Sequence, residues 1–176
     1  MEEFQGCPSE ELEKPFSYCQ ALTELLEEHP SLRQQMDQFK QTAMQIKQNG
    51  KGNMNLESLY QQMRRFKVDI DLHSAKEEDG LFEMMVSHIG REGGPIAVME
   101  EEHRLAKDHL GSFFKKYSRN VSEGLAIELA QHVLIVYQTL TDHFMKEEQI
   151  LFPMAEQMLS TKEKEMLMQQ FQLLSK

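Results

Sequence analysis

The stretch His73-Ser74-Ala75-Lys76-Glu77-Glu78-Asp79-Gly80-Leu81-Phe82 has a close copy later in the chain, His143-Phe144-Met145-Lys146-Glu147-Glu148-Gln149-Ile150-Leu151-Phe152. Both read His-x-x-Lys-Glu-Glu-x-x-Leu-Phe. A second pair of similar stretches lies upstream, Leu25–Arg33 and Val98–Leu105, and in each an acidic run leads into a lone histidine. The chain therefore contains two related halves, each with one lone histidine followed by a His-x-x-x-Glu pair.

The segments that carry these repeats have the apolar spacing of helices, and glycine and proline gather only between them. The pattern predicts four long helices and a short fifth, over about residues 10–48, 56–89, 95–117, 123–159 and 160–176. Val133–Tyr137 is β-prone by itself but lies inside a long helical pattern, so we interpret it as buried helix. The predicted fold is all-α, an up-down-up-down four-helix bundle. Its parts are an arm with the start of the first helix (1–21), the bundle (22–159) and a C-terminal helix (160–176).

Several residues predict where the helices begin. Pro15 marks the expected start of the first helix, and Pro95 and Ser122 suit the starts of the third and fourth. Pro30 is expected to kink the first helix and to bias His29 away from helical geometry.

The C-terminal helix has its own signature. Ser160-Thr161-Lys162-Glu163 has the form of a capping box. The residues after it predict an apolar stripe of Met166, Phe171 and Leu174.

Composition limits the functions that fit this chain. Its 176 residues are 40% hydrophobic and carry a net charge of −10, which argues against binding to nucleic acid or to an anionic membrane. No apolar run approaches the roughly 18–20 residues of a membrane span, and the acidic start lacks the apolar stretch of a secretory signal, so we expect a cytoplasmic protein. Two cysteines, Cys7 and Cys19, exclude a disulfide scaffold and a cysteine-rich metal site.

The spacing of the repeated His-x-x-x-Glu pairs points to metal binding. Residues four apart share one helix face, about 5–6 Å apart, so each pair can reach the same metal or adjacent metals. All four helices of a bundle can direct side chains to its centre. The candidate ligands are four imidazoles and two carboxylates: His29, His73, Glu77, His103, His143 and Glu147.

This ligand set restricts the metal. Mixed imidazole and carboxylate ligands favour iron, manganese or zinc over calcium or magnesium. Six protein ligands are too many for one zinc ion. They suit two metals, with the carboxylates of Glu77 and Glu147 as bridges.

The remaining histidines and the neighbouring glutamates are not expected to be ligands. His88 and His132 have no repeated context, and His109 falls on the far, exposed side of its helix. We interpret Glu78 and Glu148 as solvated or as partners of the ligands. Glu28 and Glu102 either reach a mouth of the site or lie on a solvated helix face, and we favour the solvated face.

Over about residues 22–159 the sequence resembles the hemerythrin-like family of HHE cation-binding domains. The resemblance is carried by Glu28-His29, Glu102-His103 and the two His-x-x-Lys-Glu-Glu strings, the second followed by Ile150-Leu151-Phe152-Pro153. It implies a four-helix bundle with an oxo- or hydroxo-bridged, non-haem di-iron centre, which makes iron the expected metal and manganese and zinc the alternatives. Family members include oxygen carriers, oxygen, redox and iron sensors, and di-iron proteins linked to nitric oxide stress and iron–sulfur repair.

One departure from the oxygen carriers is informative. They have a His-x-x-x-His pair on the third helix and a His-x-x-x-x-Asp on the fourth. Here Lys107 stands four residues after His103, and the fourth helix carries His-x-x-x-Glu. With one imidazole fewer and a nearly two-fold symmetric set, the chain resembles the branch linked to nitric oxide and iron–sulfur repair.

Three functions follow from these observations. The first is a cytosolic di-iron protein that binds or reacts with O2, NO or peroxide. The second is a metal- or oxygen-sensing module whose metal-dependent folding controls a protein partner. The third is a structural bundle that holds zinc or no metal.

Overall fold

The computed structural model describes residues 17–49 and 53–174, so Cys7 and the expected start at Pro15 lie outside the described residues. Within them the chain forms five continuous helical rods. The first is α1 (Gln20–Asn49), and the second joins α2 (Asn53–Lys76), η1 (Glu77–Phe82) and α3 (Glu83–Ile89). The third is α4 (Pro95–Lys116), the fourth joins α5 (Glu123–Lys146), η2 (Glu147–Leu151) and α6 (Phe152–Met158), and the last is α7 (Thr161–Leu174).

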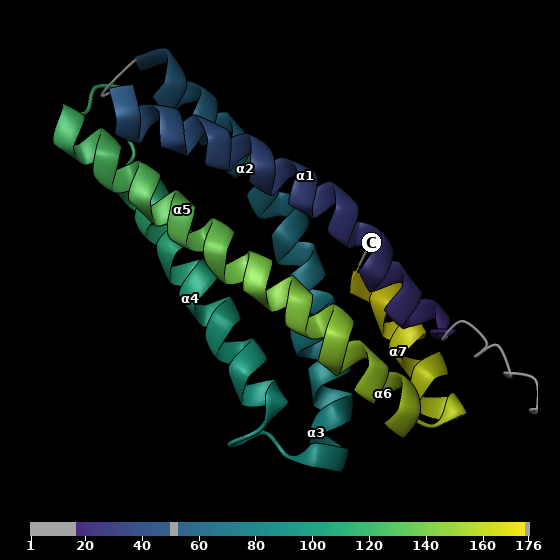
Figure 1. The fold of residues 1–176 in the computed structure, drawn as a ribbon. Coiled ribbons are helices and arrows are strands. Elements are labelled where there is room, and N and C mark those ends of the chain that lie inside the picture. Colours follow the sequence, from purple (N-terminus) through teal and green to yellow (C-terminus); the bar gives the residue numbers. More distant parts are fainter. Residues whose placement is uncertain (1–16, 50–52, 175–176) are drawn as a thin grey trace, which may run out of the picture.

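The rods form the expected up-down-up-down bundle (Figure 1). Helix α1 lies against α2 and α5, and α4 lies against α5. Helix α7 packs beside α1 and α2 near the end of the bundle where the chain begins. The prediction of an all-α bundle with an extra C-terminal helix is confirmed.

The apolar core is divided into two clusters by a buried polar layer. Along α1, Leu25 belongs to one cluster and Leu32 to the other, with buried His29 between them. Along α4, Met99 and Ala106 are separated in the same way by His103. The bundle therefore holds these polar side chains at one level along its axis, between the two apolar clusters.

The beginnings of the helices follow local chemistry. The Ser122 hydroxyl accepts the Leu125 amide at 3.2 Å, and Pro95 stands in the first turn of α4, as predicted. The first helix begins at Gln20, later than Pro15 suggested, because the Cys19 amide donates to the Glu156 carboxylate at 2.7 Å and anchors the non-helical approach.

The expectation that Pro30 would pull His29 out of helical geometry is wrong. Helix α1 runs through both residues without interruption, and His29 is buried. Leu25 and Leu32 pack on either side of it, and the His29 ring stacks on Phe144 with centroids 4.4 Å apart. Tertiary packing of this face outweighs the loss of one backbone hydrogen bond at the proline.

Two widened helical turns were not foreseen. The rods α2–α3 and α5–α6 each contain a π-helical segment, η1 and η2, and each segment begins at the second residue of a His-x-x-x-Glu pair, Glu77 or Glu147. Such segments occur often at functional sites. Here they reset the helix register so that the Leu-Phe pair that ends each repeat is buried.

Helix α7 begins with the predicted capping box, since the Ser160 amide donates to Glu163 at 2.8 Å and the Glu163 amide donates to the Ser160 hydroxyl at 3.3 Å. The predicted apolar stripe is only partly right, because Met166 is 49% exposed and Leu167 is buried with Phe171 instead. Both buried side chains lie over Gly80 of η1, where a Cβ atom would meet them at 3.0 and 3.1 Å.

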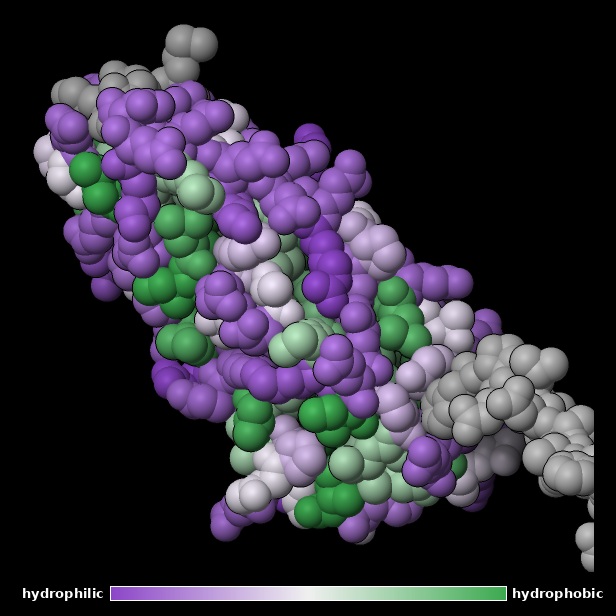
Figure 2. Space-filling view, in the orientation of Figure 1, coloured by the Kyte–Doolittle hydropathy of each residue, from purple (hydrophilic) through white to green (hydrophobic). Residues whose placement is uncertain are grey.

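No helix among the described residues is long and apolar enough to cross a membrane. The face in Figure 2 is mostly hydrophilic, with hydrophobic residues in a stripe on its upper left and in a group toward its lower end. Exposed apolar side chains of the described residues include Val98 of α4, Met145 of α5 and Ile150 of η2.

The fit of α7 against η1 can be tested at Gly80. Ile150 stands at the equivalent place in the other repeat, so Gly80→Ile is the natural substitution. We expect it to lower the free energy of unfolding by about 1–3 kcal/mol, since the new side chain collides with Leu167 and Phe171. Gly111→Ile on α4, where a Cβ meets nothing within 4 Å, is the control and should not destabilise the protein. Equal stability of both variants in urea unfolding would mean that α7 does not lie on Gly80.

Candidate metal centre

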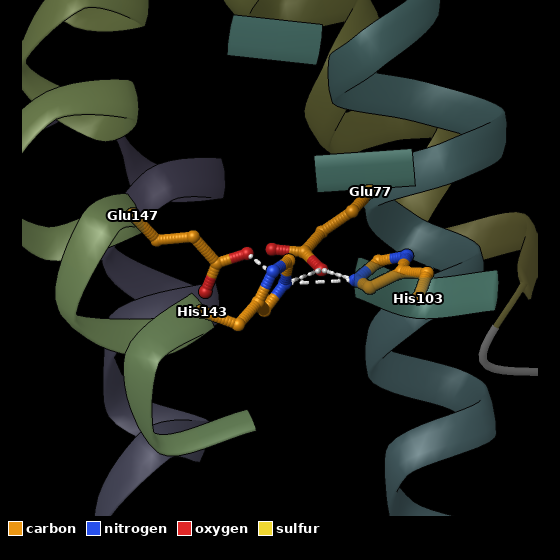
Figure 3. Close-up of side chains that lie close together, drawn as sticks. All are labelled: Glu77, His103, His143 and Glu147. Carbon is orange, nitrogen blue, oxygen red and sulfur yellow. Dashed lines mark hydrogen bonds and ion pairs between the residues drawn. The ribbon is translucent and has the colours of Figure 1, made fainter. Parts of the chain in front are cut away.

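Six buried side chains converge in the polar layer between the two apolar clusters. Four of them, drawn in Figure 3, offer ligand atoms that all lie within 4.8 Å of one another: Glu77, His103, His143 and Glu147. A second such group is His29, His73 and Glu147. All six residues proposed from the sequence are therefore brought together, His29 included, and Glu147 belongs to both groups.

The imidazoles are arranged in two pairs, one from each half of the chain. The Nε2 atoms of His103 and His143 face each other at 2.8 Å. The rings of His29 and His73 lie with centroids 5.1 Å apart. Each half of the duplication thus contributes two imidazoles to its own side of the layer.

The two carboxylates lie between these pairs. Glu77 directs Oε1 to His73 Nε2 at 3.6 Å and Oε2 to His103 Nε2 at 3.3 Å. Glu147 directs Oε2 to His29 Nε2 at 3.2 Å and Oε1 to His143 Nε2 at 2.8 Å. Each carboxylate therefore has one oxygen on each side, which is the arrangement of a bridge between two cations.

Several buried polar atoms of the layer lack hydrogen-bond partners. Six of its inward-facing atoms make no hydrogen bond of good geometry: Nε2 of His29 and His73, and both carboxylate oxygens of Glu77 and Glu147. Buried polar atoms without partners are costly, and buried carboxylates more so. Imidazole nitrogens and carboxylate oxygens are ligands of borderline transition metals, so the donor set fits a metal centre.

The outer nitrogen of each imidazole is held by a further glutamate. His29 Nδ1 lies 2.7 Å from Glu148, and His103 Nδ1 lies 2.6 Å from Glu78. These two contacts join the halves, because each glutamate comes from the opposite one. They fix the rings so that Nε2 points inward, as metal-binding histidines require.

Glu28 and Glu102 hold the other two imidazoles, so their expected place on a solvated helix face is wrong. Glu28 lies 2.7 Å from His73 Nδ1, and Glu102 lies 3.1 Å from His143 Nδ1. Each directly precedes the lone histidine of its own half. The acidic residue before that histidine was visible in the sequence, but its reach to the neighbouring helix was not.

A cation backs each of these four glutamates. Glu148 pairs with Arg33 and Glu78 with Lys107, and these cations lie four residues after His29 and His103. Glu28 pairs with Lys76 and Glu102 with Lys146, each in the Lys-Glu-Glu part of a repeat. Every imidazole thus begins a chain of imidazole, carboxylate and cation that runs away from the centre of the layer.

Helix α7 makes the two halves unequal. Lys76 is 3% exposed, under Phe171 with its Nζ 5.6 Å from the ring centroid, and it also pairs with Glu24. Its counterpart Lys146 is 33% exposed. The lysine that ends one chain is therefore covered by α7, whereas the equivalent lysine of the other half is partly exposed to solvent.

The carboxylates of the layer and around it favour the protonated form of three of the four imidazoles. Burial disfavours a charged ring, but the carboxylates of Glu77 and Glu28 outweigh it and raise the pKa of His73. The pKa of His103 and that of His143 are raised for the same reason. Burial works against the charged form of Glu77 too, yet the surrounding imidazoles hold its pKa well below 4.5.

The other histidines lie away from this layer. His88 pairs with Glu163 at the surface. His132 is separated from the centre along α5, as expected. His109 is not on an isolated exposed face, because it is half-buried against His132, with Nδ1 atoms 2.8 Å apart.

The raised histidine pKa values predict how pH affects stability. Protonation of these rings stabilises the metal-free fold fully below about pH 6.5, and this contribution is lost as pH rises through the raised pKa. Metal binding needs neutral imidazoles, so it strengthens over the same range. We expect the difference in Tm between metal-loaded and metal-free protein to widen from about pH 6 to about pH 8.5, measured by calorimetry. A gap that narrows would show that the metal-free rings are neutral.

The contact between each outer glutamate and its imidazole predicts that loss of the glutamate weakens metal binding. Glu102→Gln should weaken metal binding by about 10–100-fold, because it removes the carboxylate that orients His143. Glu101→Gln is the matched control. Glu101 is the exposed neighbour of Glu102, and among the described contacts its carboxylate pairs only with Arg104. Competition with a chelator measures both. The same loss in both variants would count against an orienting role for Glu102.

The comparisons with known proteins agree with this geometry. No curated protein and no solved structure matches the chain. The family described as "Hemerythrin HHE cation binding domain" matches residues 20–155, which span α1 to α6 and include all six inward-facing side chains. With a match over most of its length and a buried cluster able to hold metal ions, the chain belongs to the hemerythrin HHE cation-binding domain family.

Proposed function

We propose that this chain is a cytosolic, non-haem di-iron protein that binds or reacts with O2, NO or peroxide. The proposed ligands are His29 and His73 for one iron, His103 and His143 for the other, and Glu77 and Glu147 as bridges. The placement of both carboxylates, with one oxygen toward each imidazole pair, is the observation that supports two metals rather than one.

Iron in this set would supply a change of oxidation state and coordination positions that six protein ligands leave open. The residues of the chain supply the surroundings. Glu28, Glu78, Glu102 and Glu148 accept from the outer imidazole nitrogens and keep the inner ones aimed at the layer. They also strengthen each imidazole as a donor.

Aromatic residues keep water away from the layer. Phe144 stacks on His29, and the ring centroid of Phe82 lies 5.6 Å from that of His103. Both are fully buried. A small apolar ligand such as O2 or NO suits such surroundings better than an ion does.

The first experiment is metal analysis of the purified protein, followed by spectra of the reduced form exposed separately to O2, NO and peroxide. We expect about two irons per chain, as six ligands with two bridging carboxylates imply, and a spectral change with at least one reactant. Glu147→Gln should lose iron, whereas Glu83→Gln at an exposed position should keep it. Zinc in place of iron after reconstitution, or equal iron in both variants, would contradict the proposal.

A second candidate is a metal-sensing module that acts through folding. The unpartnered atoms of the layer favour this candidate. They lie between the two apolar clusters, and their burial without partners lowers the stability of the metal-free fold. Two results together would favour the sensor. The iron centre would be inert to all three reactants, and the metal-free protein would have a much lower Tm than the metal-loaded protein and would lose binding to a partner. The choice between the nitric oxide or iron–sulfur repair branch and the oxygen carriers rests on which reactant changes the spectrum.

A further inference from the structure

We propose that His109 of α4 and His132 of α5 form a second metal site, for a divalent ion of the zinc class, on the outside of the bundle. It is separate from the buried layer. His109 lies six residues beyond His103, about 9 Å along α4, and His132 lies eleven residues before His143, about 16 Å along α5. The inference does not depend on what the buried layer binds.

The two rings present nitrogens to each other across the helix pair. Their Nδ1 atoms are 2.8 Å apart, and the ring centroids are 5.0 Å apart with the planes at 53°. Only one proton fits between two such nitrogens, so in the neutral pair one of them must donate and the other accept. A cation that accepts both lone pairs removes this restriction, and two imidazoles on adjacent helices are a chelating pair for Zn²⁺, Ni²⁺ or Cu²⁺.

A carboxylate lies beside the pair, on the other nitrogen of His132. Glu128 lies four residues before His132 on the same helix face, with Oε1 3.9 Å from His132 Nε2, whereas Nδ1 is the atom that faces His109. The Glu128 carboxylate is held by the Lys116 ammonium at 2.5 Å. The two imidazoles are therefore the protein donors of the proposed site, and water supplies the others.

This site differs from the buried one in character. His109 and His132 are only partly buried, and their Nδ1 atoms satisfy each other without metal. The pair is therefore not forced to bind, so we expect weaker and exchangeable binding, with water completing the tetrahedral set. A bound ion would link α4 to α5 on the flank of the bundle.

The test is a zinc titration of the whole chain, followed by calorimetry and by histidine chemical shifts in NMR spectra. The buried layer is first saturated with whichever metal it takes up, so that only a further zinc is counted. Wild-type protein should bind one further zinc. His109→Gln and His132→Gln should each weaken that binding by at least about tenfold, as loss of a ligand does. Lys116→Gln should strengthen it, because it removes a positive charge near His132.

His88→Gln is the control, since it removes a surface histidine that pairs with Glu163 instead. It should leave the zinc affinity unchanged, and equal melting temperatures would show that the variants fold alike. Absence of the further zinc, or binding that survives both His109→Gln and His132→Gln, would overturn the proposal. The pair would then be an inter-helix hydrogen bond only.

Discussion

The fold depends on one electrostatic constraint: two buried carboxylates, Glu77 and Glu147, lie in a layer with no hydrogen-bond donor of good geometry for their oxygens. Burial of such groups is tolerable only if positive charge is present. Protons on His73, His103 and His143 provide some of it, and bound metal would provide more. The two apolar clusters on either side hold these groups together and keep water out, so packing and charge act on the same six side chains.

Groups of alternating charge extend outward from the layer in the same order at each imidazole. Each imidazole contacts a glutamate, and each glutamate contacts a lysine or arginine. Two of these series of groups, those through Glu78 and Glu148, cross between the halves of the chain. The duplicated halves are therefore joined by polar contacts around the centre as well as by the apolar core.

Much of this could be predicted from the sequence, because the repeated His-x-x-x-Glu string fixes helix faces by spacing alone. The four rods, the capping box and the convergence of the six side chains follow from such local patterns. What could not be predicted depends on neighbouring helices. The reach of Glu28 to His73, the helical geometry of His29 beside Pro30 and the burial of Leu167 in place of Met166 are settled by packing between elements distant in sequence. The assignment of the six residues as metal ligands remains a prediction.

The widened turns η1 and η2 make the two halves alike in backbone as well as in sequence. A π-helical turn holds one more residue than the α-helical turn it replaces. In both halves the widened segment begins directly after the repeated His-x-x-x, at Glu77 or Glu147. The two carboxylates therefore leave the same kind of irregular backbone on opposite sides of the layer. Only the surroundings of the two turns differ, because Leu167 and Phe171 of α7 cover Gly80 in η1.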